Sequence, residues 1–389
     1  MKIAFVCGFF HEKNRMSFGP YPLVYNIIKG VAKRHDSFVL ASGWPKKPME
    51  DRIDGLKVYR MPSLELGIGK ENQLGLASGF LKVLREKPDV INSQGFDAAL
   101  LFKLLNLLGN KTPKITSVKS LIEARIRKVK EEWTWKDRLL IWFQKKWEKL
   151  AVANSDYFIV QSNYAKKELM QLMKVPSRKI RLIYNGVDTK SFKPMKIRKG
   201  TAPVLFFGGG ENERKGASLF FKAFIRLKKE FPGLKAIVIG SKKLEKFNEL
   251  FKANKIMLGK DIQAFERVSY TEMPIYLNKA DIVVVPSYHE TFGTINAEAM
   301  ACGKTVVASD STALPEVVGN AGLLFRTGDE RDLAAKIREL IKNKKLREQL
   351  GKKGIKRARE KFGAEKTIND YLRLFKKVAG GKKRKIFKV

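Results

Sequence analysis

Short apolar runs alternate with longer amphipathic stretches along the chain, and the pattern begins again near its middle. In the first half, the strand-like runs are 2–7, 37–41, 56–60, 88–92, 113–118, 156–161 and 179–183. The helical patterns between them are 21–34, 76–86, 97–108, 137–154 and 163–174. In the second half, the strand-like runs are 204–207, 236–239, 282–285 and 305–308. Such alternation is typical of parallel sheets covered by helices on both faces, so we predict an α/β fold with two doubly wound, Rossmann-like domains.

A stretch without a clear period separates the two halves. It covers 191–203 and contains two prolines and four basic residues, which is typical of a linker. We expect an N-terminal domain over 1–190, a C-terminal domain over 204–364, and a last helix over 365–389 that crosses back to the N-terminal domain and ends in a basic tail. Ligands of open parallel sheets bind beyond the carboxyl ends of the strands, so we expect the active site in a cleft between the halves.

The chain is strongly basic, with 78 Lys and Arg residues against 39 Asp and Glu residues and a formal net charge of +39. Such a charge attracts phosphates, anionic lipid headgroups or nucleic acid, and it does not specify a fold. No apolar run approaches the roughly 18–20 residues that span a bilayer, and two cysteines exclude a disulfide scaffold. We therefore expect a cytoplasmic protein that can be peripheral on the inner membrane face.

The segment 281–303 carries the clearest chemical signal. After a buried strand, a short polar loop contains Glu290, Gly293 permits a tight turn, and a helix follows. The first N–H groups of a helix have no intrahelical partner and carry partial positive charge, so the backbone of 293–295 predicts a phosphate-sized anion site. Glu298 lies about one turn inside the helix. Two glutamates taken at random would be solvated acids on the surface. The strand, loop and helix around Glu290 and Glu298 favour a ligand site instead.

A glycine-rich loop, 207–216, follows the first strand of the second half and precedes an amphipathic helix. Three glycines after a strand fit a simple turn as well as a phosphate loop. Lys215 favours the phosphate loop, because an ammonium group there can neutralise the charge on a departing diphosphate. Arg214, next to it, can share this task.

These residues also carry a resemblance to a known family. The stretch from His289-Glu290 to Glu298 and Gly303 resembles the two-glutamate signature of the retaining glycosyltransferases of family four, which belong to glycosyl transferases group 1 and have the GT-B fold. Further segments resemble family blocks in the family's order, namely 87–91, 153–157, 184–188, 280–287 and 314–318. The resemblance implies that Glu290 lies near the transferred sugar and that Glu298 binds the nucleotide ribose.

The function implied is a hexosyltransferase that moves a hexose from a nucleotide-diphosphate sugar to an acceptor hydroxyl with retention of configuration, without a cofactor. Its catalytic residues would be Glu290 and Lys215. Its donor-binding residues would be Glu298, Thr291, Phe292, Gly293, Thr294, Ile295, Gly209, Gly210 and Arg214. On the acceptor or phosphate side it would use Gly19, Lys119 and Asn185. The three histidines are too scattered for a zinc site and no Asp-x-Asp follows a strand, so we expect a metal-independent reaction.

Three positions depart from the family pattern. Gly210 stands where the family has an arginine, Lys119 stands where it has a histidine, and Phe18-Gly19-Pro20 replaces a pair of glycines. They leave open a second interpretation, a donor-binding relative with weak or no transferase activity. A remote alternative is a nucleic-acid-binding protein that uses the basic charge on backbone phosphates. We find none of its usual motifs, and expect no nucleic-acid partner.

Four of the five tryptophans lie between 133 and 147. One helical face there is formed by Trp135, Leu139, Phe143, Trp147 and Leu150. Such a stripe fits an ordinary core face, but tryptophan among lysines and arginines is also typical of a helix on anionic lipid. Membrane-bound acceptors are frequent in the family, so we expect a lipid-linked or membrane glycoconjugate acceptor and an anionic membrane surface as a partner.

Overall fold

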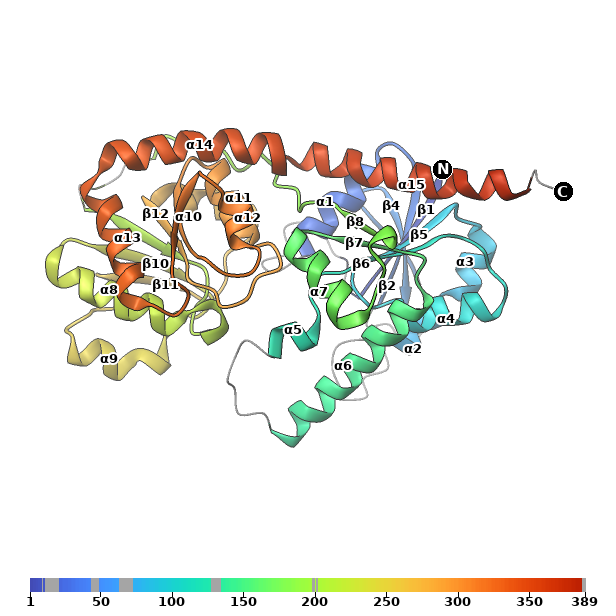
Figure 1. Ribbon diagram of the computed structural model, residues 1–389, viewed down its shortest axis with the longest axis horizontal. Coiled ribbons are helices and arrows are strands. Elements are labelled where there is room, and N and C mark those ends of the chain that lie inside the picture. Colours follow the sequence, from blue (N-terminus) through green and yellow to red (C-terminus); the bar gives the residue numbers. More distant parts are fainter. Residues whose placement is uncertain are drawn as a thin grey trace. The chain divides into compact units, whose positions relative to one another are not determined.

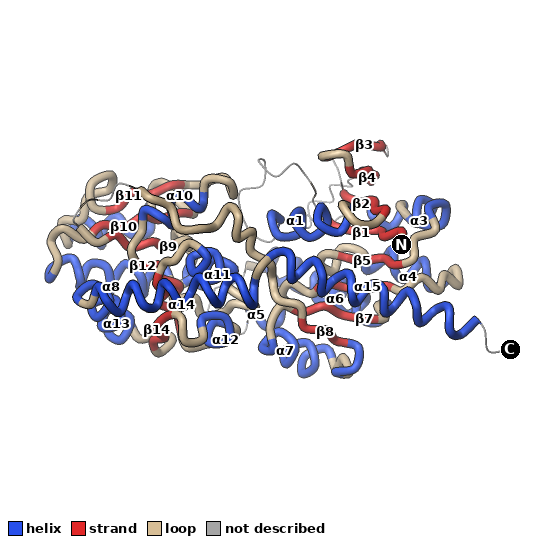
Figure 2. Tube along the Cα trace, turned by 90° about the horizontal axis from the view of Figure 1, so that it is seen from above, coloured by secondary structure: helices blue, strands red, loops and turns tan. Residues whose placement is uncertain are grey.

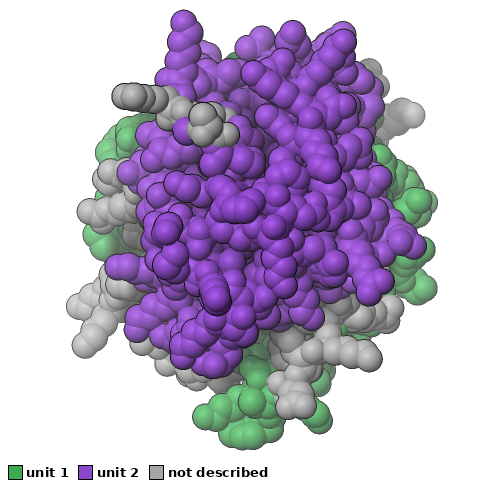
Figure 3. Space-filling view, turned by 90° about the vertical axis from the view of Figure 1, so that its left-hand side faces the viewer, with its two compact units in different colours: residues 1–186, 365–389 green, residues 187–364 purple. Residues whose placement is uncertain are grey.

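The computed structural model of the protein describes residues 1–8, 10, 21–42, 49–62, 73–126, 134–197, 200 and 202–386 (Figure 1). It contains two compact units, coloured separately in Figure 3. Unit 1 consists of Met1–Gly186 and Glu365–Val389, and unit 2 consists of Val187–Ala364. In each unit a twisted sheet carries helices on both faces (Figure 2). The predicted α/β fold class with two doubly wound domains is confirmed.

Unit 1 is built on an eight-stranded sheet with the order β3-β4-β2-β1-β5-β6-β7-β8. The strands are β1 (Lys2–Cys7), β2 (Asp36–Ser42), β3 (Met49–Ile53), β4 (Leu56–Met61), β5 (Val90–Ser93), β6 (Lys114–Ser117), β7 (Tyr157–Val160) and β8 (Ile180–Leu182). Only the edge pair β3–β4 is antiparallel among the described strands. The sequence pattern missed β3, because Met-Glu-Asp-Arg-Ile is too polar for a buried strand and forms on the edge of the sheet.

The helices of unit 1 follow the predicted order, except that the sequence pattern missed α5 and the short turn η2. They are α1 (Tyr21–Ala32), α2 (Gln73–Ser78), α3 (Phe80–Glu86), α4 (Ala99–Leu107), α5 (Ile122–Ile126), α6 (Trp135–Asn154), α7 (Asn163–Met173), the 3-10 turn η2 (Ser177–Lys179) and α15 (Ala364–Ile386). The single helix expected over 76–86 is two helices, which meet at Gly79. The last helix, α15, packs Ile368, Tyr371 and Phe375 into the core of unit 1, where the ring of Phe375 lies 6.1 Å from that of Phe5.

Unit 2 contains a six-stranded parallel sheet with the order β11-β10-β9-β12-β13-β14. Its strands are β9 (Val204–Phe207), β10 (Lys235–Ile239), β11 (Ile262–Phe265), β12 (Ile282–Val285), β13 (Thr305–Ser309) and β14 (Gly322–Phe325). The chain builds outward from β9 through β10 and β11, then returns to the other side of β9 with β12. The strand order therefore reverses between β9 and β12, which is where ligands of such sheets bind.

The helical elements of unit 2 cover both faces of this sheet. They are η3 (Glu213–Lys215), α8 (Ala217–Glu230), η4 (Glu245–Phe247), α9 (Asn248–Ala253), α10 (Met273–Lys279), α11 (Thr294–Ala301), α12 (Leu314–Val318), α13 (Glu330–Lys342) and α14 (Lys344–Phe362). An aromatic cluster fixes α8 on β9, since the rings of Phe207 and Phe220 stack with centroids 4.5 Å apart. The glycine-rich loop thus connects two elements that are anchored in the same core.

The first part of the segment predicted as a linker packs on unit 2. Phe192 is buried, and its ring lies 5.2 Å from that of Tyr270. The N–H of Met195 donates to Asn278 Oδ1 at 3.0 Å. Contacts within the structure accordingly place the start of unit 2 at Val187, before the segment predicted as a linker.

Candidate functional site

Two loops leave adjacent strands of unit 2 at the point where the strand order reverses. One follows β9 and contains the three glycines and Lys215, and the other follows β12 and contains Glu290. Because β9 and β12 pair in parallel, both loops start at the same edge of the sheet. The structure thus brings together two residues that are 75 positions apart in the sequence.

A lysine–glutamate ion pair connects these loops. Lys215 Nζ donates a hydrogen bond to Glu290 Oε1, and the same oxygen accepts the hydroxyl of Ser287 at 3.2 Å. The Glu290 side chain is 13% exposed and that of Lys215 is 32% exposed. The pair is thus sheltered on the carboxylate side, while the ammonium group keeps part of its surface open to a ligand.

The environment of Glu290 favours the ionised carboxylate. Burial alone would raise the pKa of Glu290, but the charge and hydrogen bond of Lys215, helped by Arg214 and Ser287, outweigh it and lower the pKa below its ordinary value. A carboxylate that stays charged at neutral pH can stabilise positive charge, and the cation paired with it can bind an anion.

Backbone contacts hold the two loops together around this pair. Gly216 has a φ of 79°, and a Cβ atom there would lie 2.0 Å from the carbonyl oxygen of Pro286. The N–H of Tyr288 donates to the Arg214 carbonyl at 3.0 Å, and Arg214 Nη1 donates to the His289 carbonyl at 3.2 Å. The two loops thus approach each other so closely that only glycine fits at position 216.

A third loop, after β13, supports Glu290 through Thr312. The N–H of Glu290 donates to Thr312 Oγ1 at 3.1 Å, and the N–H of Ala313 donates to the Glu290 carbonyl at 3.2 Å. Thr312 has a φ of 58°, which is unusual for a β-branched residue and is found where surrounding contacts demand it. Sequence analysis missed Thr312 and Ser287. The only signal for Thr312 was the polar run that follows the strand over 305–308.

The helix after Glu290 is α11, and it begins at the predicted glycine. Gly293 is its N-cap with a φ of 75°, and the side chain of Asn296 donates to the Gly293 carbonyl at 3.0 Å. No side chain caps the N-terminus and no acidic residue lies in the first turn, so the N–H groups near Thr294 and Ile295 favour an anion.

Phe292 and Thr291 precede that glycine in the predicted donor-binding set. The Phe292 side chain is 2% exposed and packs edge-on against Phe362 with ring centroids 5.3 Å apart. Phe292 is therefore a core residue, and only its backbone can face a ligand. Thr291 is half-buried in the loop.

Glu298 lies inside α11 and is 7% exposed. Burial raises its pKa to about 8. At neutral pH its carboxyl group is therefore mostly protonated, and it can both donate to and accept from a hydroxyl group of a ligand.

Replacing Glu298 with Gln is expected to flatten the pH dependence of stability. Between the ordinary pKa of 4.5 and the native pKa of about 8, the folded protein holds a proton that the unfolded chain has released. Stability therefore falls as pH rises through this window, by up to about 1.4 kcal/mol per pH unit from this group. Urea unfolding of Glu298→Gln at pH 5, 6, 7 and 8 should show a shallower slope than the wild type. The exposed Glu348→Gln serves as control, and equal slopes in all three proteins would contradict the prediction.

The glycines of the loop after β9 fit closely against their surroundings. A Cβ atom at Gly209 would lie 2.2 Å from the Phe207 ring. Gly210 has a φ of 53°, and a Cβ atom there would lie 2.5 Å from the carbonyl carbon of Gly240. The arginine of the family pattern could not occupy position 210 on this backbone. The guanidinium group of Arg214 lies near the same loops, where Nη1 donates to the carbonyl of His289 beside Glu290.

The residues proposed for the acceptor or phosphate side belong to unit 1. Lys119 follows β6, its carbonyl accepts Gln161 Nε2–H at 2.5 Å, and burial lowers the pKa of its side chain to about 8. Asn185 is half-buried in the loop after β8. Gly19 lies outside the described residues. The roles of Lys119 and Asn185 on the acceptor or phosphate side stay predictions.

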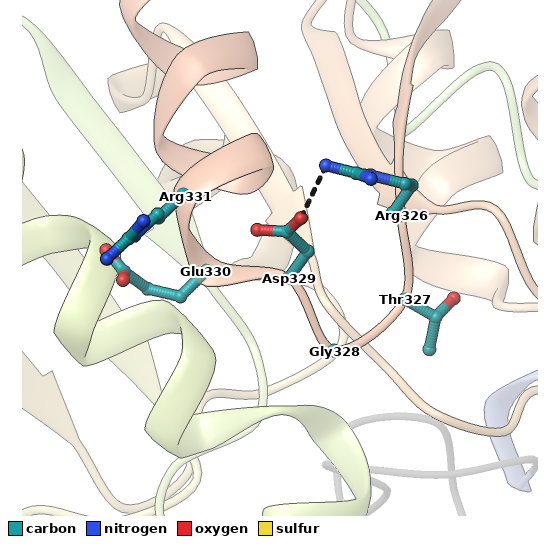
Figure 4. Close-up of a pocket in the computed structure, with 6 residues that line it drawn as sticks. All are labelled: Arg326, Thr327, Gly328, Asp329, Glu330 and Arg331. Carbon is teal, nitrogen blue, oxygen red and sulfur yellow. Dashed lines mark ion pairs between the residues drawn. The ribbon is translucent and has the colours of Figure 1, made fainter.

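A surface pocket of unit 2 lies beside the end of β14, where residues 326–331 line it (Figure 4). Three of its charged side chains form ion pairs within the unit, since Arg326 binds Asp329 at 2.8 Å and Glu330 binds Arg226 of α8 at 2.7 Å. The side chain of Arg326 is 76% exposed. The pocket contains none of the predicted site residues, so we place the candidate site at Lys215 and Glu290.

Within the described part of the chain, no three side chains among His, Cys, Asp and Glu gather closely enough to hold a metal ion. None of the helices in that part combines the length and the apolar character needed to cross a bilayer.

Comparison with known families matches both halves of the chain. Residues 23–191 match the model described as Glycosyltransferase Family 4, and residues 188–357 match the model described as Glycosyl transferases group 1. The two matches overlap at 188–191, just after the boundary between the units at Gly186 and Val187.

Individual relatives agree with the family models. An uncharacterized glycosyltransferase of Methanocaldococcus jannaschii is 33% identical over 59% of the chain, and a D-inositol 3-phosphate glycosyltransferase of Nocardioides is 27% identical over 59%. The chain spans 62% and 55% of the length of these relatives.

Solved structures show the same architecture. Sucrose-phosphate synthase from Thermosynechococcus elongatus superimposes with a TM-score of 0.81 at 19% identity, covering 98% of this chain and 99% of that one. HepE from Anabaena, in complex with UDP-glucose, superimposes with a TM-score of 0.71 at 18% identity, covering 96% and 100%. At these identities the likeness concerns the fold.

Proposed function

Because the chain belongs to the group 1 glycosyltransferases with the GT-B fold, we propose that it transfers a hexose from a nucleotide-diphosphate sugar to an acceptor hydroxyl. One observation carries the proposal: a sheltered carboxylate, Glu290, is paired with Lys215 where the strand order of unit 2 reverses. The uncapped N-terminus of α11 follows Glu290 by a few residues, so a cationic group and polarised N–H groups belong to one connected site.

In the proposed reaction, the diphosphate binds at the start of α11 and at the ammonium group of Lys215. An ammonium group has three N–H donors, so Lys215 can contact a phosphate while it keeps a bond to Glu290. The bond between the anomeric carbon and the diphosphate oxygen breaks, and its electron pair leaves with the diphosphate. Lys215 stabilises this negative charge, and the ionised Glu290 stabilises the oxocarbenium-like sugar. The acceptor oxygen then bonds to the anomeric carbon and its proton passes to the departing diphosphate.

The proposal includes three finer features. Configuration at the anomeric carbon is retained, no metal ion takes part, and the carboxyl group of Glu298 binds the ribose hydroxyls. The family resemblance of the segment that contains Glu290 and Glu298 supports the first and third. The raised pKa of Glu298 also fits a carboxyl group that shares hydrogen bonds with hydroxyls.

We further propose a lipid-linked or membrane glycoconjugate as acceptor, bound by unit 1, and an anionic membrane surface as a partner. The formal net charge of +39 supports this class of partner. Lys119 and Asn185 are the described candidates for the acceptor or phosphate side.

A screen of nucleotides tests the donor class. UDP, GDP and ADP are added to the full chain, and one of them should raise the melting temperature by about 5–10 °C at a hundred times its dissociation constant. Transfer from the matching sugar nucleotide should persist in EDTA, and NMR of the product should show the anomeric configuration of the donor. Absence of any nucleotide effect would contradict the donor site, and inversion or loss of activity in EDTA would contradict the proposed mechanism.

The same assays separate the second candidate function. A donor-binding relative without transferase activity would show the thermal shift but neither transfer nor donor hydrolysis. One observation favours this candidate: Gly210 stands where the family has an arginine. The backbone conformation at position 210 leaves no room for a side chain, so an arginine could not be restored there.

A further inference from the structure

The helix α6 of unit 1 leaves large apolar side chains in solvent. Of its 20 residues, only Glu148 and Ala151 are buried. Trp135, Leu139 and Trp142 are 71%, 41% and 51% exposed. Phe143, Trp147 and Leu150 of the predicted stripe are half-buried. The stripe is therefore not an ordinary core face, because its N-terminal half faces water.

Contacts on the opposite side fix which face of α6 points outward. Glu148 Oε1 accepts the N–H of Ile122 at 2.8 Å, and Asn106 Nδ2 donates to Asn154 Oδ1 at 3.1 Å. At the other end, Thr134 and Asp137 form a capping box that defines the first turn. In Figure 1, α6 runs beside α4 at its C-terminal end, and its first turns extend away from the sheet of unit 1. These contacts hold α6 in one orientation on unit 1, so the same face of the helix stays exposed.

The outward face combines aromatic and basic residues in one row. It consists of Trp135, Leu139, Trp142, Lys146 and Lys149, at spacings of four, three, four and three. Lys146 Nζ lies 4.8 Å from the centroid of the Trp142 ring. The row therefore begins with three apolar side chains and continues with two lysines. The long lysine side chains can lie along an apolar surface and place their ammonium groups at its charged boundary.

The charge on this face is of one sign. The helix contains five basic and two acidic residues. Both acidic side chains are engaged inside unit 1, since Asp137 caps the helix and Glu148 binds the backbone of Ile122. Exposed tryptophan and leucine next to exposed lysines match a surface with an apolar interior and anionic phosphates at its boundary. A soluble acidic partner would account for the lysines but offers no apolar layer for three large side chains.

We propose that the outward face of α6 docks on an anionic lipid bilayer, with Trp135, Leu139 and Trp142 at the level of the acyl chains and Lys146 and Lys149 at the phosphates. This inference deepens the proposed function, on which it rests for the class of acceptor. Docking itself is measured without turnover, so its failure and the failure of the transferase proposal are separate outcomes.

Vesicle flotation at low salt tests the docking. The full chain should float with vesicles of phosphatidylcholine and phosphatidylglycerol, and much less with phosphatidylcholine alone. The triple variant Trp135→Ser, Leu139→Ser, Trp142→Ser should lower the partition coefficient by at least about tenfold. Its matched control is Met257→Ser, Leu258→Ser, Ile275→Ser in unit 2, where the three side chains are 48%, 42% and 41% exposed. This control should bind like the wild type.

Charge is tested by a second matched pair. Removing Lys146 and Lys149 by substitution with Gln should weaken binding to anionic vesicles by roughly fivefold per lysine. The same substitutions at the exposed Lys352 and Lys353 of α14 remove equal charge and should have little effect. If binding depended only on the net charge of the chain, both pairs would weaken it equally and the assignment to α6 would be wrong.

Tryptophan fluorescence gives an independent readout. Anionic vesicles should shift the emission of the wild type to shorter wavelength, and the triple variant should lose most of that shift. Wild-type binding by the triple variant, or no binding of the wild type to anionic vesicles, overturns the proposal. An α6 variant that hydrolyses the donor normally but no longer floats supports it and shows that the donor site is intact.

Discussion

Replacing Lys215 with Ala should lower kcat by a factor of about 10²–10³, the usual cost of removing one group that stabilises charge in a transition state. The substitution removes the ammonium group that we assign to the departing diphosphate, and it leaves Glu290 without its strongest partner. The exposed Lys222→Ala on α8 is the matched control and should leave turnover unchanged. Steady-state transfer with saturating donor measures both variants.

The same variant should also change the pH dependence of activity. Lys215 opposes the effect of burial on Glu290, so its removal raises the pKa of that carboxyl group. If the reaction needs the ionised carboxylate, its acid limb should move to higher pH in Lys215→Ala, and Lys215→Arg should restore the wild-type limb in part. Turnover of Lys215→Ala within twofold of the wild type would remove the basis of the mechanism.

The fold could be predicted from the sequence because strands in a parallel sheet are buried on both faces. Runs such as 282–285 and 204–207 are continuous and apolar, and they form β12 and β9. The strands that were missed lie at the sheet edges, where one neighbouring strand is absent. β3 is polar, β11 contains Gln263 and β14 begins with Gly322. Such strands are defined by the partner with which they pair and carry little apolar signal of their own.

The site could be predicted only in part. Lys215 and Glu290 stand out in the sequence because each lies in a loop between a buried strand and a helix. Their direct pairing could not be predicted, because it depends on how the two loops approach each other. Thr312 was missed for the same reason: its loop after β13 contacts Glu290 through a left-handed conformation that no residue preference indicates. Phe292 was assigned to the donor by its position next to Gly293, although its size and burial make it a core residue.

Replacing Gly216 with Ala should destabilise unit 2 by about 3 kcal/mol or more and reduce turnover more strongly than its stability effect explains. The left-handed φ of 79° costs roughly 1–2 kcal/mol for any residue with a Cβ atom. The added atom would also lie 2.0 Å from the Pro286 carbonyl oxygen, so the two loops must separate. Since Lys215 and Glu290 belong to these loops, their ion pair should break.

Gly259→Ala provides the control that isolates the close approach. Gly259 is also in unit 2 and has a φ of 86°, but a Cβ atom there would meet nothing within 4 Å. It should therefore show only the conformational cost and keep full activity. Urea unfolding and transfer rates of the two variants, measured below their unfolding transitions, separate backbone strain from loop separation. Equal destabilisation and equal activity of Gly216→Ala and Gly259→Ala would contradict this prediction. The contact between Gly216 and Pro286 would then not be what positions Lys215 and Glu290.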